Sequence, residues 1–546
     1  MSLRTRHLAI AVCLFLISSV TSVQGQFRVP AGARFRLGTG SNPLLSVTFS
    51  PDGSLLAMAG YDNAIELWDV ATGKNVRRWE APEGCIANLV FSPNGHLLAS
   101  GAIYESTVHL WDVATGKKVR ELEGLPHGVS SLAFAPDGKI LAAGGYGTDA
   151  VYLWEVASGK PVAPFVGADV PLQNFNGQRS PLLEYSYVGF APDGKSLASG
   201  HVYGLVRIWD MATRRETRHF RGPETDAFVH VSYAADNQLL VGWGETIRLW
   251  KTDTGKQPLF TNWGESMGLW KTETAKPLRS FGEQAEMRIA TVALSPDGRM
   301  LASGSSGATG GDDQVHLWET ATGAESCKLA GHEYAVSAAA FSPDGRTLAS
   351  ASRDGTAILW DVRALPTDAP DQTFATPAEL EAYWRDLAQS DAGVAFRAIR
   401  ALVRVPRNAP PFLESRLMPL ARADADQINR WAKTLDNKVF KVREEAAQNL
   451  AMQMEMAEPL LKAVLANQNS AETRRRLQQI MGFAAAGGLI PKQLQILRSL
   501  EILETIGTAE AQRVLEKMAG GEPGFQITRD AKSALARLKK LTARRQ

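Results

Sequence analysis

The sequence predicts an all-β propeller of seven blades followed by an all-α region of short, paired helices. A phrase of the type F-S-P-D-G, followed 11 to 18 residues later by L-W-D, recurs along two-thirds of the 546 residues. The tryptophans of these phrases are most often about 42 residues apart. Such a period, with four short strands per unit, is typical of propellers. After Pro366 the hydrophobic period changes from 2 to about 3.6, which indicates helices.

Each repeat can be read locally, as the first one shows. Leu45–Phe49 alternates like a half-buried strand, and Pro51-Asp52-Gly53 has the residues of a tight turn. The small apolar run Leu55–Ala59 suits a strand that is buried on both faces. Ala64–Asp69 and the charged Asn75–Glu80 follow as the third strand and an outer edge strand. The tryptophans that mark the seven copies are Trp68, Trp111, Trp154, Trp209, Trp250, Trp318 and Trp360.

These repeats resemble the WD-repeat β-propeller family over roughly residues 33–363. The resemblance implies that the first blade is offset, so that an N-terminal strand completes the last blade. Ala33–Leu37 stands where that strand is expected, and the last repeat ends at Asp361 after three strands of its own. Pairing of the two ends would close the ring and remove its open edges.

The resemblance also implies a hydrogen-bond set that joins a His, a Ser or Thr, an Asp and the repeat Trp. Only the last blade holds all four, as His332, Ser350, Asp354 and Trp360, whereas other blades keep fragments such as Ser199 with Trp209 or Asp62 with Trp68. Three of these residues could be mistaken for a catalytic triad. We expect a structural role, because the Trp and the Asp saturate the Ser and the His.

We expect no catalytic residue, no cofactor and no metal site in this sequence, which lacks the H-E-x-x-H pattern of zinc proteases. His109 and His316 precede their tryptophans by two positions, which predicts packing on a strand. Cys85 and Cys327 fall in different blades, too far apart for a disulfide bond, so we expect two separate, mostly buried thiols.

The N-terminus, residues 1–25, reads as a signal peptide. Arg4 and Arg6 precede the 13-residue apolar stretch Leu8–Val20, and small residues follow around Gly25. We therefore expect an extracytoplasmic protein, periplasmic or secreted, without a membrane span after cleavage; an uncleaved anchor is the alternative. The net charge of +2 points to no polyanionic partner, so we expect no nucleic-acid partner.

Three irregular stretches interrupt the repeats. Residues 243–258 recur at 263–277 with a 20-residue shift, and this duplication predicts an extra hairpin on the fifth blade. Residues 167–186 form a long insertion, and 304–313 read as a long turn because a strand, not a helix, follows their glycines.

Residues 364–375 read as a linker and 376–546 as a helical domain. Thr376-Pro377-Ala378-Glu379 has the residues of a helix start with a capping box. About ten helices of 10 to 16 residues are expected, paired like Leu500–Ile506 and Ala511–Met518. They resemble HEAT-type repeats, which stack into a solenoid, and the whole layout resembles large bacterial WD-repeat proteins. We expect the propeller and this domain to fold independently.

The sequence therefore predicts an exported, non-enzymatic scaffold that contacts protein partners. Propellers and solenoids both offer broad rigid faces, and we expect no catalytic residues. The alternative is an extracytoplasmic propeller enzyme, of hydrolase or lactonase type, that uses the central funnel. Fold class alone does not decide between them.

Overall fold

The computed structural model describes most of residues 29–545. The residues outside this description are 1–28, 83, 147, 149, 168–185, 202–204, 222–228, 234–237, 244–245, 252–268, 272–275, 280–288, 306–312, 363–373, 468–469, 486–487 and 546. The predicted signal peptide lies outside the described residues, as do most of the insertions 167–186 and 304–313.

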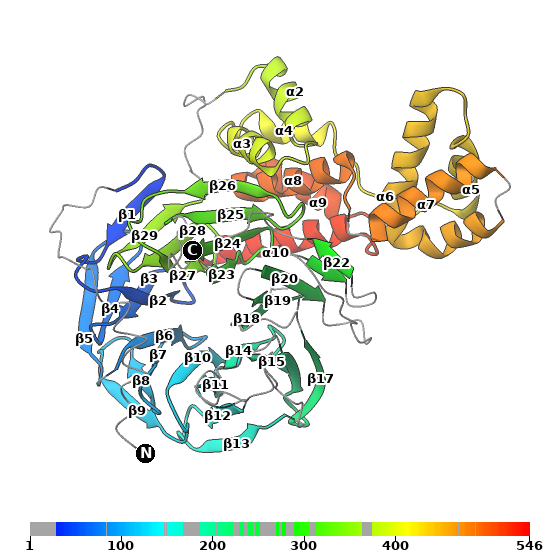
Figure 1. Cartoon of the computed structure of the whole chain (residues 1–546). Helices are drawn as coiled ribbons and strands as arrows, with labels where there is room; N and C mark the ends of the chain where they lie inside the picture. The colour runs from blue at the N-terminus through cyan, green and yellow to red at the C-terminus, as the bar shows by residue number, and fades with distance from the viewer. Residues whose placement is uncertain are drawn as a thin grey trace.

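The first two-thirds of the chain forms antiparallel sheets arranged around a ring (Figure 1). The ring begins with four successive four-stranded sheets. Their strands are β2 (Leu44–Phe49), β3 (Leu55–Gly60), β4 (Ala64–Asp69) and β5 (Asn75–Glu80); β6 (Ile86–Phe91), β7 (Leu97–Ala102), β8 (Val108–Asp112) and β9 (Lys118–Leu122); β10 (Val129–Phe134), β11 (Ile140–Gly145), β12 (Val151–Glu155) and β13 (Pro161–Phe165); and β14 (Ser186–Phe190), β15 (Ser196–His201), β16 (Leu205–Asp210) and β17 (Arg215–Arg221).

The remaining sheets are less uniform. The fifth repeat gives a three-stranded sheet, a two-stranded hairpin follows, and the last two sheets again have four strands. Their strands are β18 (Val229–Tyr233), β19 (Gln238–Trp243) and β20 (Thr246–Lys251); β21 (Leu269–Lys271) and β22 (Lys276–Arg279); β23 (Ile289–Leu294), β24 (Met300–Ser305), β25 (Val315–Glu319) and β26 (Glu325–Leu329); and β27 (Val336–Phe341), β28 (Thr347–Ser352), β29 (Ala357–Asp361) and β1 (Ala33–Leu37).

The described residues thus contain six complete blades, not the seven predicted. The fifth repeat has Ala235 and Asn237 where the others have the Pro and the Gly of the first turn, and the duplicated segment stands where the others have an outer strand. Within that segment β21 and β22 form the expected extra hairpin, and β21 lies next to β20.

The ring closes through the two ends of the propeller, as predicted. β1 pairs antiparallel with β29, with Leu37 opposite Ala357 and Phe35 opposite Leu359. The blade cores lie between neighbouring sheets, so Leu37, Leu44 and Leu359 share one cluster although they come from both ends of the ring. β1 buries apolar side chains against the first and the last blade. This strand is therefore part of the propeller core.

Nine helices are described after the propeller. The predicted helix start is confirmed, because the Thr376 side chain accepts from the Glu379 amide and Glu379 in turn accepts from the Thr376 amide. The helices are α2 (Pro377–Asp386), α3 (Ala392–Val403), α4 (Ala409–Glu414), α5 (Ala425–Thr434), α6 (Phe440–Ala466), α7 (Ala471–Ala485), α8 (Pro491–Ile506), α9 (Ala509–Ala519) and α10 (Gln526–Arg545). Gly507, in the left-handed region, ends α8 directly after Ile506.

The helical packing differs from the expected solenoid. In a solenoid each repeat contacts only its neighbours, whereas here α3, near the start, packs on α8, near the end. The helices α5, α6 and α7 form a lobe with its own core around Leu450 and Leu477 (Figure 1). At 27 residues, α6 is longer than the 10 to 16 residues expected, and it continues through Pro459. No helix in the described part of the chain is long and apolar enough to cross a membrane.

Candidate functional site

The four residues of the predicted hydrogen-bond set meet in the last blade. His332 Nδ1 lies 2.9 Å from Asp354 Oδ2, and His332 Nε2 lies 2.7 Å from Ser350 Oγ. Trp360 Nε1 donates to the same Ser350 oxygen at 2.8 Å. All four residues are buried. The serine hydroxyl is therefore held between two partners inside the blade and does not face solvent.

A fifth residue, Arg36, completes this set and was missed from the sequence. It lies on the closing strand β1, and its guanidinium bonds Asp354 Oδ2 at 3.0 Å and the carbonyl of Gly331 at 2.9 Å. The side chains of Arg36 and Asp354 are 7% and 1% exposed. The set thus ties the N-terminal strand to the last blade in addition to stabilising the loop around His332. Nothing in the sequence around Arg36 indicates that it pairs with Asp354, which lies more than 300 residues away.

Asp354 is held as a carboxylate. Burial alone would raise its pKa, but the hydrogen bonds from His332, Thr356 and the Glu333 amide outweigh burial, and the pKa lies below the usual value. These donors come from two segments, 332–333 and 356, and Arg36 on β1 adds a third.

The Ser–Trp half of this set recurs in other blades. In each pair, the residue that pairs with the Trp on the neighbouring strand lies two positions before the serine. The serine and the Trp therefore lie on the same face of the sheet, and the indole N–H reaches the serine hydroxyl diagonally. The pairs are Ser100 with Trp111, Ser199 with Trp209 and Ser303 with Trp318. The first blade keeps Asp62 and Trp68 from the set, but they have other partners: Trp68 donates to Glu66, and Asp62 pairs with Arg78. Met58 replaces the serine there and offers no oxygen acceptor.

The fourth blade contains a variant of the set that the sequence did not indicate. His201, on β15 itself, lies 2.8 Å through Nε2 from the Ser199 hydroxyl that also accepts from Trp209. His201 is fully buried, and burial, together with the nearby charge of Arg207, lowers its pKa to about 3. It is therefore a neutral imidazole at pH 7 and acts as a hydrogen-bonding core residue.

The other residues singled out in the sequence have structural surroundings. His109 and His316 are buried on β8 and β25, as expected, beside Glu105 and Glu325 respectively. No disulfide bond joins Cys85 and Cys327. Among the residues that the structure describes, no group of three His, Cys, Asp or Glu side chains could hold a metal ion.

The helical domain is docked on the sixth blade through buried charges. Arg498 of α8 bonds both carboxylate oxygens of Glu319, at the end of β25, at 2.7 Å each. Arg299, from the turn before β24, bonds Glu504 of α8 at 2.8 Å, and Arg537 of α10 bonds the same carboxylate. Arg498 and Glu504 are 2% and 6% exposed. The propeller and the helical domain are therefore joined by a buried interface.

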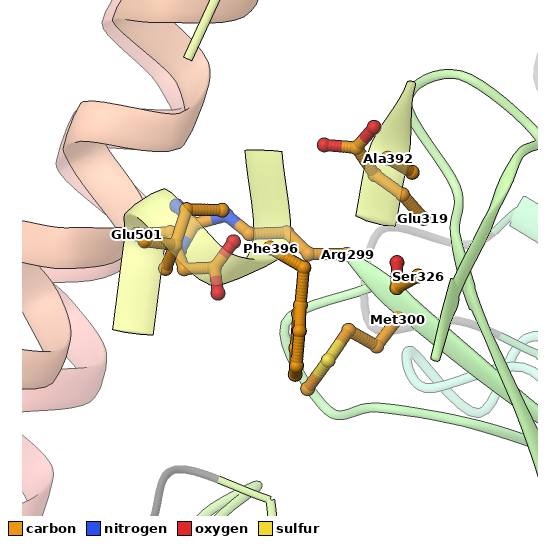
Figure 2. A pocket seen from close by; sticks show the side chains of 8 residues that line it. Arg299, Met300, Glu319, Ser326, Ala392, Phe396 and Glu501 are labelled. Carbon is orange, nitrogen blue, oxygen red and sulfur yellow. The ribbon is translucent and has the colours of Figure 1, made fainter. Parts of the chain in front are cut away.

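An apolar contact lies beside these charges and borders a small cavity at the junction (Figure 2). Phe396 of α3 belongs to the core between the β23–β26 sheet and the sheet of β27, β28, β29 and β1, and Met300 of β24 is part of the same cluster. Figure 2 shows Arg299 extending from the propeller toward the helices, where Glu501 faces the cavity. Burial raises the pKa of Glu501, although Arg400 and Arg299 oppose this effect. Ion pairs, Phe396 and the edge strand β26, against which α3 packs, form one interface.

The two faces of the ring differ in composition. Strand direction alternates, so the turns between second and third strands and the links between blades share one face, and the other turns share the opposite face. Among the described residues of the last blade and the first three, the first face carries four tyrosines and no lysine; we call it the tyrosine face. Its tyrosines are Tyr61, Tyr104, Tyr146 and Tyr334.

The opposite face of the same four blades has the reverse composition. Its turns carry no tyrosine and hold the exposed lysines Lys74, Lys117, Lys139 and Lys160. Arg299 and Glu319, which anchor the helical domain, also lie in turns of this opposite face. Docking of the helices therefore leaves the tyrosine face of the four blades uncovered. Tyr104 and Tyr334 are 56% and 50% exposed.

Comparison with known families supports the repeat assignment. Six stretches match the WD40 family, described as "WD domain, G-beta repeat": residues 35–69, 73–112, 116–155, 170–210, 275–319 and 323–361. Residues 211–274, which hold the three-stranded sheet and most of the duplication, are not among them.

Several curated eukaryotic proteins are similar to parts of the chain. Pre-mRNA-processing factor 19 of Oryza sativa subsp. japonica is 28% identical over 92 residues, which cover 16% of this chain and 18% of the relative. Eukaryotic translation initiation factor 3 subunit I of Phaeosphaeria nodorum is 44% identical over 55 residues, 10% of this chain and 16% of the relative. The same subunit of Emericella nidulans is 43% identical over 63 residues, 11% and 18%.

The chain thus spans less than a fifth of the length of these relatives. They are eukaryotic, so the expected bacterial setting receives no support from them, and neither the exported setting nor the HEAT-like identity of the helices is supported. Taken with the sheets and their closure, the six matches identify the chain as one that carries WD40 repeats, arranged as a propeller and followed by a helical region.

Proposed function

We propose that this protein is a non-enzymatic scaffold that binds protein partners through the tyrosine face of its propeller. The observation that carries the proposal is the contrast between the two faces. Protein interfaces are enriched in tyrosine and depleted of lysine relative to the rest of a surface. The tyrosine face has this composition over four successive blades, whereas the opposite face has the reverse.

The residues between the tyrosines support the same function. The links on this face are rich in Gly, Ser, Asn and Pro, as in Gly38-Thr-Gly-Ser-Asn-Pro43. Tyrosine with Ser, Gly and Asn is the composition of antibody binding loops, where rigid aromatic rings supply contact area and small residues let the partner approach. The hydrogen-bond set of Arg36, His332 and Asp354 holds two of these loops on a rigid frame.

The relatives point in the same direction by their names, which are those of a pre-mRNA processing factor and a subunit of a translation initiation factor. A subunit works in an assembly. The proposal takes from them only the role of a scaffold, and no partner.

The seven-bladed ring and the export of the chain are part of the proposal. The fifth repeat supplies three strands and an adjacent hairpin, which together would fill the place of a seventh blade. The leader-like residues 1–25 support an exported protein. N-terminal sequencing of the mature chain from fractionated cells tests the export: a chain beginning near Gln26 supports it, and an intact Met1 in the cytosol contradicts it.

Comparative capture tests the scaffold function. The double variant Tyr104→Ser with Tyr334→Ser removes the two exposed rings, and we expect it to lose partners that the wild type retains. The control, Val76→Ser with Val119→Ser, alters outer-strand residues that are 50% and 49% exposed. Equal partner sets for all three proteins would contradict the use of this face.

A further inference from the structure

The tyrosine face also carries an excess of carboxylates, and this indicates the chemistry of its partner. Its loops in the last blade and the first three hold five acidic side chains that the structure describes, of which Asp354 is buried. Among the described residues of these loops, Arg353 is the arginine, His127 and the buried His332 are the histidines, and none is a lysine. The other four acids are Asp62, Glu105, Glu123 and Glu333.

Two of these carboxylates have no partner within the described chain. Asp62 pairs with Arg78, and Glu105 lies 3.3 Å from His109. Glu123 and Glu333 are exposed and form no ion pair with another described side chain. Glu333 directly precedes the exposed Tyr334. An aromatic ring and a carboxylate thus stand side by side at the rim of the ring.

This pairing suits a cationic side chain from another protein. A Lys or Arg side chain can lay its apolar stem against an aromatic ring while its charged end meets a carboxylate, and the ring face itself attracts a cation.

Building on the proposed scaffold function, we infer that the tyrosine face binds an extended segment of a partner protein in which Lys or Arg residues alternate with apolar or small residues. The spread of the tyrosines over four blades gives a long contact line rather than one deep pocket, which is the shape that an extended segment fits. Charge complementarity selects a basic segment over an acidic one.

Two synthetic peptides test this inference with the full-length protein. Both alternate Phe and Gly with a charged residue, which is Lys or Arg in the first peptide and Glu in the second. We expect the basic peptide to bind, by fluorescence anisotropy, and the acidic peptide not to bind. Raised ionic strength should weaken the binding, because exposed charges are screened.

A pair of matched variants locates the binding. Glu123→Gln with Glu333→Gln should weaken the basic peptide about three- to ten-fold, as expected for two exposed ion pairs. Glu510→Gln with Glu516→Gln makes the same change of net charge on the exposed face of α9 and should leave the affinity unchanged. Equal binding of both peptides, absence of binding by the basic peptide, or equal losses in the two variants would each overturn the inference.

The outcomes separate this inference from the scaffold function on which it rests. If Tyr104→Ser with Tyr334→Ser loses captured partners but Glu123→Gln with Glu333→Gln keeps them, the scaffold function stands and the basic partner is wrong. If neither double variant loses partners, both are wrong. Self-association of the wild type that the glutamate variant abolishes, measured by sedimentation, would show that a second copy occupies the face, which also overturns the inference.

Discussion

Arg498 forms a bidentate ion pair with Glu319 across the junction between the helices and the propeller. Its Nε and Nη2 atoms each lie 2.7 Å from one carboxylate oxygen. The same arginine bonds the carbonyls of Leu387 and Gln389, so one side chain joins α8, the end of α2 and the sixth blade. A bidentate pair of this kind fixes orientation as well as distance. The junction therefore sets how the helical domain sits on the ring.

Replacing this arginine should destabilise the whole protein. Arg498→Met keeps the apolar stem but removes the buried charged partner of Glu319 and a donor to two carbonyls, so we expect a loss of about 3 kcal/mol in unfolding free energy. Urea unfolding measures this loss. Arg475→Met, at the exposed pair with Glu472, is the control and should be nearly neutral. Similar midpoints for both variants would show that the junction does not stabilise the chain.

The same junction changes what we expect of the domain boundary. The sequence predicted independent folding, because the period changes near Pro366 and the linker contains Pro and Asp. The structure shows Phe396, Arg498 and Glu504 buried against the ring. Independent folding stays a prediction, and limited proteolysis between residues 362 and 376 tests whether the two fragments separate or remain bound through this interface.

The serine of the complete set should matter more than the serine of a partial set. Ser350 bridges His332 and Trp360, whereas Ser303 accepts from Trp318 in the sixth blade. Ser350→Ala leaves both an imidazole and an indole nitrogen unsatisfied, so we expect a loss of about 2–3 kcal/mol, against about 1 kcal/mol for Ser303→Ala. Thermal and urea unfolding compare the two; equal losses would mean that the His332 bond contributes nothing.

The sequence predicted those parts of the molecule that depend on local chemistry. The Pro-Asp-Gly turns, the small apolar second strands and the capping box at Thr376 each act over a few residues, and each formed as expected. The closing strand could be predicted because an incomplete last repeat needs a fourth strand.

The parts that the sequence did not indicate are long-range pairings. Arg299 stands at the position where other repeats carry a Lys or Arg, such as Lys139 and Arg346, so nothing marks it as the partner of Glu504. Glu319 departs slightly from the repeat pattern, because most repeats have Asp after the Trp. Its longer side chain is the one that reaches Arg498. The path of α6 through Pro459 depends on packing of the lobe core and not on the proline itself.

Acid should weaken the last blade through Asp354. Its folded pKa lies below the usual value, so the unfolded chain takes up the proton first as pH falls. The stability it contributes is present above about pH 3.9, the ordinary Asp value, and is lost as pH falls through the lower folded pKa. Asp354→Asn should therefore be less stable than the wild type at pH 7, and the difference should shrink toward pH 3. A constant difference across that range would contradict the assigned charge.

His201 should produce a second acid dependence, in a different pH window. Its pKa in the folded protein is about 3, because burial and the charge of Arg207 oppose protonation, whereas an unfolded His titrates near 6.5. Between these values the unfolded chain binds a proton that the folded chain does not, so stability must fall as pH decreases from about 6.5 toward 3. His201→Gln removes this titration and leaves an amide that can still bond the Ser199 hydroxyl. We expect the variant to lose some stability at pH 7.5 from imperfect packing, but to show a flatter decline between pH 6.5 and 4.5 than the wild type.

Urea unfolding at several pH values measures both slopes, and His127→Gln, at an exposed histidine of the tyrosine face, is the matched control that should keep the wild-type slope. Parallel slopes for the wild type and His201→Gln would mean that this imidazole is protonated in the folded blade and that the neutral hydrogen bond to Ser199 is wrongly assigned.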